Sequence, residues 1–281
     1  MLRVAIPNKG QLSDPARDML REAGYAAAAN ARELVVQDPE NDVEFFFLRP
    51  RDIAIYVGRG TIDIGITGTD LLADSGAKAE TLMELGFAPS TFRLAAPVGL
   101  AKDVSYAKGK RIATSYAGIL RTWLDDNKID AEIVKLDGAV ENSVALGVAD
   151  LVADVVATGT TLRQAGLEIV GDPIFKSEAL LVARPDAVND PRVTVFTRRL
   201  QGVITARAYV LVDYDVPNDL IDKACAITPG IESPTVSPLQ NSAWSAVRAM
   251  VPRKNVHTIM DELYDLGARG VLVTDIHACR L

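Results

Sequence analysis

Several classes of protein require residues that this sequence contains only in small numbers. It has two cysteines, Cys225 and Cys279, among 281 residues. So few thiols argue against a disulfide framework and indicate a reducing compartment. The two histidines, His257 and His277, lack the spacing of metal ligands, so the sequence does not predict a zinc site.

Long apolar runs and an excess of positive charge are also missing. No run approaches the roughly 18 apolar residues that a membrane span needs, and the opening residues MLRVAIPNKG predict a strand rather than a signal peptide. We therefore expect a cytoplasmic protein. The net charge of −7 disfavours nucleic acid as a partner. An anionic ligand would have to be held by local donors, not by the overall field.

The sequence does contain a regular alternation of apolar strands and helical segments. Residues 2–6, 43–48 and 62–67 predict strands, and each is followed by a turn and a helical segment. Such β-α units predict a parallel α/β sheet whose ligands lie beyond the carboxyl ends of the strands. By this rule five residues collect at one rim: Lys9, Arg49, Thr67, Gly68 and Asp70. Taken singly, such residues are more often helix caps or solvated charges, but their shared placement at strand ends favours a binding site.

The segment from Glu141 to Leu162 carries the clearest chemical signal. It begins with a short helical stretch that ends at Gly147, a residue type suited to the left-handed end of a helix. Residues 151–156 then predict a buried parallel strand. Asp154 lies inside this strand, where a carboxylate is costly unless it is paired. The turn Thr158-Gly159-Thr160-Thr161 opens the next helix.

This order of strand, turn and helix makes an anion site. The first N–H groups of a helix lack partners within it, and the helix dipole favours negative charge there. Gly159 allows the backbone to curl around a phosphate, and Asp154 could accept hydrogen bonds from two ribose hydroxyls. The alternative is that the threonines only cap the helix and that Asp154 is a satisfied buried acid.

The same segment resembles a known enzyme family. Nine residues are in register with the signature of ATP phosphoribosyltransferases, the first enzymes of histidine biosynthesis: Glu141, Gly147, Ala149, Val152, Asp154, Thr158, Gly159, Thr161 and Leu162. The resemblance implies an Mg²⁺-dependent transferase that joins N1 of the ATP adenine to C1 of phosphoribosyl pyrophosphate (PRPP) and releases pyrophosphate. It also implies inhibition by histidine, and dimers that assemble into hexamers.

The resemblance also implies roles for particular residues. PRPP would be bound by Glu141, Asp154, Val155, Thr158, Gly159, Thr160 and Thr161. The nucleotide would be bound by Gly10, Arg49, Thr67, Asp70, Leu71 and Tyr116. Catalysis would rest on Asp154, Lys9 and Arg49, with Mg²⁺ carried by the substrate phosphates and no metal ligand assigned to the protein. Tyr116 could stack on the adenine or simply cover the edge of the sheet.

The expected fold is α/β, with a two-lobed catalytic core like the type II periplasmic binding proteins. Residues 1–91 would form lobe I, completed by about 184–210, and residues 92–183 would form lobe II. From 211 to 281 the strand and helix pattern reads βαββαβ, which predicts a ferredoxin-like domain. The resemblance implies that this domain is regulatory and binds histidine near Asp215 and Thr235. Alternatively, Asp215 is simply an acidic residue at the end of a strand.

Two other functions are compatible with a bilobal pattern. Prephenate dehydratase is similar in length, and Ser90–Arg93 and Glu232–Pro234 superficially match its motifs. Its dehydration chemistry, however, has no use for a phosphate-binding turn. The other is a small-ligand-binding protein of the periplasmic type, which would normally carry a secretion signal.

Overall fold

The structure is a computed structural model that describes residues 1–26 and 34–280. The chain forms two compact units. Unit 1 comprises Met1–Arg21 and Tyr25–Thr197, and unit 2 comprises Glu22–Gly24 and the chain from Arg198 onward. Among the described residues, no helix is both long and apolar enough to cross a membrane.

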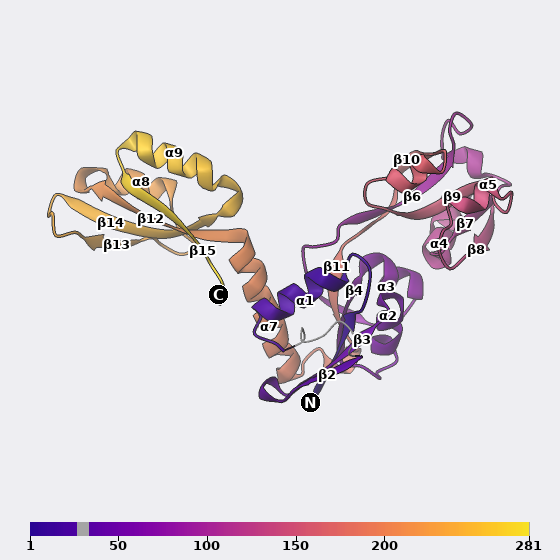
Figure 1. The fold of residues 1–281 in the computed structure, drawn as a ribbon, viewed down its shortest axis with the longest axis horizontal. Helices are drawn as coiled ribbons and strands as arrows, with labels where there is room; N and C mark the ends of the chain where they lie inside the picture. The colour runs from indigo at the N-terminus through magenta and orange to yellow at the C-terminus, as the bar shows by residue number, and fades with distance from the viewer. Residues whose placement is uncertain (27–33, 281) are drawn as a thin grey trace. The chain divides into compact units, whose positions relative to one another are not determined.

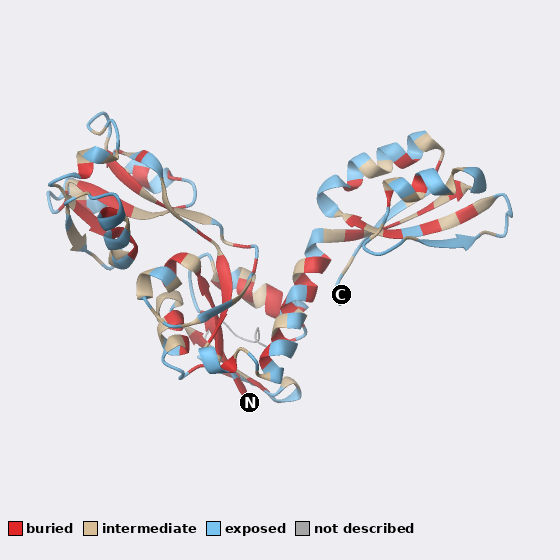
Figure 2. Cartoon of the chain, turned by 180° about the vertical axis from the view of Figure 1, so that it is seen from behind, coloured by how far each residue is buried: buried red, intermediate tan, exposed pale blue. Residues whose placement is uncertain are grey.

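Unit 1 contains two lobes, each built on its own sheet (Figure 1). The strands of lobe I, in spatial order, are β2 (Val35–Asp38), β3 (Val43–Leu48), β1 (Leu2–Pro7), β4 (Ile64–Gly68), β11 (Ala179–Ala183) and β5 (Glu80–Glu84). Its helices are α1 (Ser13–Glu22), α2 (Pro50–Gly58) and α3 (Thr69–Ser75). Apolar residues occupy both faces of the central strands, which Figure 2 shows as buried.

Helices cover both faces of this sheet. On one face Ile53 and Val57 of α2 pack with Ala5 of β1. On the other face the ring of Tyr25 contacts Phe45 of β3 edge to face, with centroids 5.8 Å apart, and stacks on Phe196 at 4.8 Å. Burial on both faces explains why the central strands are continuous apolar runs.

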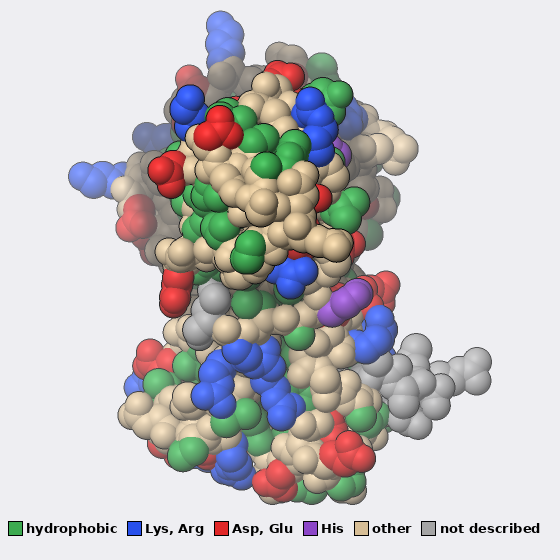
Figure 3. Space-filling view, turned by 90° about the vertical axis from the view of Figure 1, so that its left-hand side faces the viewer, with side chains coloured by type: hydrophobic (Ala, Val, Ile, Leu, Met, Phe, Trp, Pro, Cys, Tyr) green, Lys and Arg blue, Asp and Glu red, His purple; other side chains and the backbone are tan. Residues whose placement is uncertain are grey.

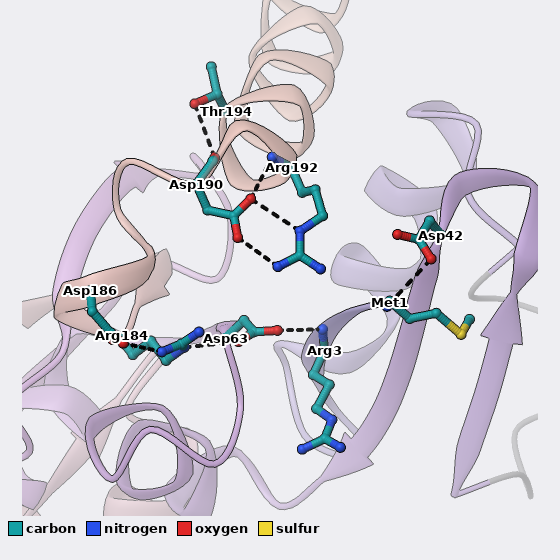
Figure 4. Close-up of polar contacts among 9 residues, drawn as sticks. All are labelled: Met1, Arg3, Asp42, Asp63, Arg184, Asp186, Asp190, Arg192 and Thr194. Carbon is teal, nitrogen blue, oxygen red and sulfur yellow. Dashed lines mark hydrogen bonds and ion pairs between the residues drawn. The ribbon is translucent and has the colours of Figure 1, made fainter.

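Ion pairs and hydrogen bonds connect several segments of the chain at the end of the sheet where β1 begins (Figure 4). Asp63 accepts hydrogen bonds from the backbone N–H of Arg3 at 2.8 Å and from Nε of Arg184 at 2.9 Å, and Arg184 also pairs with Asp186. Asp190 accepts from the backbone N–H of Arg192 at 2.8 Å. These contacts lie at the opposite end of β1 from Lys9, so we assign them to stability.

Lobe II is built on a second sheet. Its strands, in spatial order, are β10 (Leu167–Ser177), β6 (Ser90–Pro97), β9 (Leu151–Val156), β7 (Arg111–Thr114) and β8 (Glu132–Lys135). Its helices are α4 (Ala117–Asp126), α5 (Asn142–Ala145) and α6 (Thr160–Gln164). The core between α4 and the sheet includes Leu120, Leu124, Ile112 and Leu151.

Both sheets are mixed, whereas the sequence pattern predicts parallel ones. In lobe I, β11 runs antiparallel to β4, and in lobe II, β9 is parallel to β7 but antiparallel to β6. The reason is that the chain leaves lobe I and later returns to it, so strands distant in sequence insert beside the β-α units. The edge strands β2 and β5 were not predicted, because both are short and partly exposed.

The chain crosses between the lobes at two places. It leaves lobe I between β5 and β6, and it returns between Ser177 of β10 and Ala179 of β11. Strand β11 therefore belongs to the sheet of lobe I, and the expected end of lobe II at residue 183 is corrected to Glu178. Apolar periodicity does not identify the sheet that a strand joins.

Unit 2 begins in the long helix α7 (Pro191–Ala208). It continues through β12 (Tyr209–Pro217), α8 (Ile221–Ile227), β13 (Thr235–Pro238), β14 (Trp244–Pro252), α9 (Val256–Leu266) and β15 (Arg269–Asp275). The antiparallel sheet has the order β13-β14-β12-β15, which is the ferredoxin-like arrangement predicted from the βαββαβ pattern. Short 3₁₀ turns precede α8 (Asn218–Leu220) and α9 (Arg253–Asn255).

The helices α8 and α9 cover one face of this sheet (Figure 1). Alternate residues of β12, including Val210, Val212 and Tyr214, pack against Ala224 of α8 and Leu263 of α9. The intervening residues of β12 point to the opposite face. Figure 3 shows one face of the molecule, on which some Lys and Arg side chains gather in a group and acidic side chains lie scattered elsewhere.

Candidate active site

Among the hollows of unit 1, two neighbouring ones are lined by residues that the sequence singles out. The larger of these two is a cavity of about 440 Å³ at the carboxyl ends of the lobe I strands. It is lined by Lys9, Gly10, Gln11, Leu12, Arg49, Pro50, Arg51, Asp52, Gly68, Asp70, Leu71, Ala88, Ser90, Tyr116, Asp137, Val155, Ser177 and Glu178. The smaller, of about 330 Å³, is lined by Gln11, Glu141 and residues 154–162. Gln11 and Val155 line both hollows, so the two adjoin.

The rim predicted from the strand ends largely forms the wall of the larger cavity. Lys9 follows β1, Arg49 immediately precedes α2, and Asp70 is in the first turn of α3. Thr67 is different, because its side chain is fully buried and its hydroxyl donates to the carbonyl of Pro50 at 3.1 Å. Thr67 thus supports the start of α2 and does not line the cavity.

Asp70 is held by a residue that the sequence gives no means of finding. Its backbone N–H donates to the Ser177 hydroxyl at 3.1 Å, and that hydroxyl donates to Asp70 Oδ1 at 2.6 Å. A Cβ added at Gly68 would lie 2.3 Å from the same carboxylate oxygen, so a larger residue there would displace the Asp70 side chain. Ser177 is 107 residues away in sequence and carries no local motif.

Tyr116 precedes α4 and forms part of the cavity wall. The guanidinium carbon of Arg51 lies 4.8 Å from its ring centroid, and the ring of Phe92 lies 5.5 Å away. Burial, and secondly the neighbouring Asp70 carboxylate, raise the pKa of the Tyr116 phenol. The hydroxyl therefore stays protonated and can donate a hydrogen bond.

The predicted anion site is formed by the loop between β9 and α6. Gly159 has φ of +71°, the left-handed conformation that its sequence position predicts. The Arg163 guanidinium bonds the carbonyl of Thr158 and the hydroxyl of Thr160, both at 3.2 Å. Arg163 is a cation that the sequence analysis did not identify, and it lies within α6. The loop before this helix leads to the first N–H groups of α6, the kind of groups that attract anions.

Asp154 lies beside this loop in the wall of the smaller hollow. Burial raises its pKa to about 6, the Glu141 carboxylate adds to the rise, and a hydrogen bond from the backbone N–H of Val155 at 2.8 Å opposes it. The carboxylate is thus ionised at neutral pH at a cost to stability. A buried, charged acceptor maintained at such a cost is typical of a functional site.

The arrangement fits anion binding and group transfer. It combines a glycine-containing helix start, a carboxylate beside it, and cationic side chains across an adjoining cavity. Within the described part of the chain, no group of three or more histidine, cysteine, aspartate and glutamate side chains could hold a metal ion. Fold and site together define a bilobal α/β protein with an added ferredoxin-like domain and a polar site of the kind that suits an anionic ligand.

Comparison with known proteins identifies the family. A family model described as ATP phosphoribosyltransferase matches residues 49–202, and a second, described as its C-terminal domain, matches residues 206–278. ATP phosphoribosyltransferases from Pseudarthrobacter chlorophenolicus and Streptomyces coelicolor are 61% and 58% identical, with all of both chains covered. The chain belongs to the ATP phosphoribosyltransferase family, in the long form that carries the C-terminal domain.

A solved structure agrees with this assignment. A chain of the ATP phosphoribosyl transferase complex from Thermotoga maritima is 29% identical, with a TM-score of 0.63 over 72% of this chain and 97% of that one. The resemblance seen in residues 141–162 is thereby confirmed, and the dehydratase and the binding protein are set aside. The activity is phosphoribosyl transfer to ATP in histidine biosynthesis.

Proposed function

We propose that the two hollows divide the substrates of this reaction, with PRPP in the smaller and ATP in the larger. The observation that carries this division is that Asp154 and the start of α6 line one hollow. A ribose 5-phosphate needs one acceptor for its hydroxyls and one anion site for its phosphate. The larger cavity has the cationic and aromatic side chains that a nucleotide needs, including Arg49 and Tyr116.

In this scheme Asp154 accepts hydrogen bonds from the ribose hydroxyls, and residues Thr158 to Thr161 hold the 5-phosphate. Glu141 and Val155 complete the wall around the ribose. Lys9 and Arg49 contact substrate phosphates from the adjoining cavity, where Gly10, Asp70 and Leu71 face the nucleotide. Thr67 has no direct contact in the scheme, since it is buried beneath α2.

In this reaction the protein mainly positions the two substrates and stabilises the charge of the transition state. The bond from C1 of PRPP to pyrophosphate breaks as the lone pair of adenine N1 forms a new bond to C1 with inversion. The transition state resembles an oxocarbenium ion, which fixed acceptors and oriented substrates favour. Adenine N1 needs no general base, because its lone pair is already free.

We infer that Mg²⁺ enters on the pyrophosphate of the substrate. Magnesium prefers substrate phosphates and water to a cage made wholly of protein, and when bound it neutralises charge on the leaving group. This chain's own residues then supply the remaining contacts. Lys9 and Arg49 meet phosphate oxygens from the cavity wall.

The first expected result is pyrophosphate release from ATP and PRPP that depends on Mg²⁺. Chelation with EDTA should abolish release, and added Mg²⁺ should restore it, since the leaving group carries the ion. The measurement is a coupled pyrophosphate assay on the full-length chain. Full activity after exhaustive chelation would contradict the magnesium proposal, while absence of release under all conditions would contradict the transfer reaction itself.

For regulation, we propose that histidine binds on the open face of the unit 2 sheet. Cross-strand pairing aligns Asp213, Arg248 and Thr235 in one row, and Asp215, Ala246 and Ser237 in the next. Side chains directly opposite each other share a face, so Asp215 and Thr235 lie on the same face, away from α8 and α9. This face offers the Asp215 carboxylate for an ammonium group, and the Thr235 hydroxyl lies on the same face, two strands across in the adjacent row.

We expect Asp215→Asn to raise the histidine concentration needed for half inhibition by about tenfold or more, because a charged hydrogen bond is lost. Uninhibited activity should stay within about twofold. Inhibition is measured by pyrophosphate release against histidine concentration. The matched control is Asp222→Asn on α8, an exposed acid of the same unit. Unchanged inhibition in Asp215→Asn would exclude this site.

We further propose a cytoplasmic enzyme that assembles from dimers into hexamers. The support is the family membership, since biosynthesis from ATP and PRPP takes place where those substrates are made.

A further inference from the structure

The start of helix α4 in lobe II is capped by a residue of lobe I. Tyr116, at the N-cap position, makes no side-chain cap. Instead Asp74, in the last turn of α3, places Oδ1 2.7 Å from the backbone N of Gly118 and 3.3 Å from that of Ile119. These N–H groups have no partner within the helix, and the helix dipole favours a carboxylate there.

The other oxygen of the same carboxylate binds a second lobe I residue that also reaches across. Asp74 Oδ2 lies 3.2 Å from Nη1 of Arg51, and that nitrogen donates to the carbonyl of Ser115 at 2.6 Å. The Asp74 side chain is 11% exposed, so solvent competes little for these bonds. The Arg51 guanidinium lies over the ring of Tyr116. The two lobe I side chains thus hold residues 115–119 of lobe II.

The close approach depends on a residue without a side chain. A Cβ built on Gly118 would lie 2.6 Å from the backbone oxygen of Asp74 and 3.1 Å from its Oδ1. Backbone cannot move aside as a flexible side chain does, so even alanine would force α3 and α4 apart. Gly118 is therefore part of the contact, although its sequence context does not indicate this.

This contact adjoins the proposed ATP cavity. Residues of the two chain crossings, Ala88 and Ser177, line that cavity, and so do Arg51 and Tyr116. The smaller hollow receives Gln11 from lobe I and otherwise residues of lobe II. A change in the spacing of the lobes would therefore alter the ATP cavity much more than the PRPP hollow.

We propose that Asp74 is a positioning residue that latches lobe I to the start of α4 and, through Arg51, fixes Tyr116 in the wall of the ATP cavity. The latch comprises Asp74, Arg51, Ser115, Gly118 and Ile119. It rests on the proposed division of substrates, and it adds that the assembled ATP site depends on a contact made between the lobes. ATP, which touches both lobes, requires the latched form, whereas PRPP bound alone does not.

The test is steady-state kinetics combined with direct binding, on the full-length chain. For Asp74→Ala we expect kcat/KM for ATP to fall by about tenfold to a hundredfold, because the three hydrogen bonds that the carboxylate accepts are lost. The Kd of PRPP alone, from calorimetry, should stay within about twofold. Asp74→Asn keeps an oxygen for the two N–H groups and should lie between Asp74→Ala and the wild type. Asp126→Ala, an exposed acid on α4, is the matched control and should leave both values unchanged.

Gly118→Ala tests the same contact with the latch side chains intact. It should reproduce the selective loss of kcat/KM for ATP, and PRPP affinity should again be retained. Equal losses of ATP and PRPP binding in either variant would indicate a general structural defect and overturn the proposal. Wild-type kcat/KM in both variants would also overturn it, while leaving the proposed function standing.

A measurement without substrates separates the latch from the proposed function. Hydrogen exchange at the amides of Gly118 and Ile119 should be slow in the wild type and at least about tenfold faster in Asp74→Ala, because the cap is lost. Unchanged exchange would refute the latch even if the enzyme releases pyrophosphate. Faster exchange supports the latch even if the division of substrates between the hollows is wrong.

Discussion

Asp154→Asn should all but eliminate PRPP binding and at the same time stabilise the protein. The carboxylate is the proposed acceptor of two ribose hydroxyls. A hydrogen bond to a charged group contributes about 1.5 to 3 kcal/mol, so we expect the Kd of PRPP to rise by about a hundredfold or more. Asparagine keeps the shape and can still accept the bond from the N–H of Val155, so the fold should be preserved.

The gain in stability should depend on pH in a defined way. The pKa of Asp154 is about 6 in the folded protein and 3.8 as its ordinary value. Because the folded state holds this proton more tightly, the wild type loses stability as pH rises from about 4 to about 6. Asp154→Asn has no carboxylate there and does not lose this stability. The difference in the free energy of unfolding between the variant and the wild type should be close to zero below pH 4 and reach about 1 to 3 kcal/mol above pH 6.

Calorimetric titration with PRPP and thermal unfolding at a series of pH values measure the two effects. Asp125→Asn, an exposed acid on α4, serves as the control and should change neither. Wild-type affinity for PRPP in Asp154→Asn would remove Asp154 from the ribose site. A stability difference that does not vary between pH 4 and pH 8 would show that the buried charge is not its cause.

The second large effect is expected in the loop after β9. Thr158→Val combined with Thr161→Val should weaken PRPP binding by about tenfold to a hundredfold, since two hydroxyl donors near the 5-phosphate are removed. Both threonines are exposed, so isosteric valines should leave thermal stability nearly unchanged. The affinity for ATP, for which we propose the adjoining cavity, should stay within about twofold.

Thr194→Val combined with Thr258→Val is the matched control for this double variant. These threonines are exposed on α7 and α9, and neither of them lines either hollow. The control should retain wild-type affinity for both substrates, as measured by calorimetry. If the loop variant also binds PRPP as the wild type does, the 5-phosphate is held elsewhere.

The sequence by itself determined the features that depend on neighbouring residues. The strand, turn and helix order around Asp154 and Gly159 predicted a local anion site, and the βαββαβ pattern predicted the ferredoxin-like domain that the structure has. Hydrophobic periodicity and glycine turns are local signals, so they can be recognised without knowledge of the fold. The nine-residue match to the ATP phosphoribosyltransferase signature was likewise readable from one segment.

Tertiary structure alone decided the features that depend on residues distant in sequence. Ser177 meets Asp70 only because β10 returns beside lobe I, and Asp74 meets Gly118 only because two helices of different lobes pack together. Thr67 was expected at the nucleotide, yet the direction of its side chain buries it beneath α2. Alternation along a strand shows that side chains point to opposite faces, but which face meets the ligand depends on the elements that pack on each side.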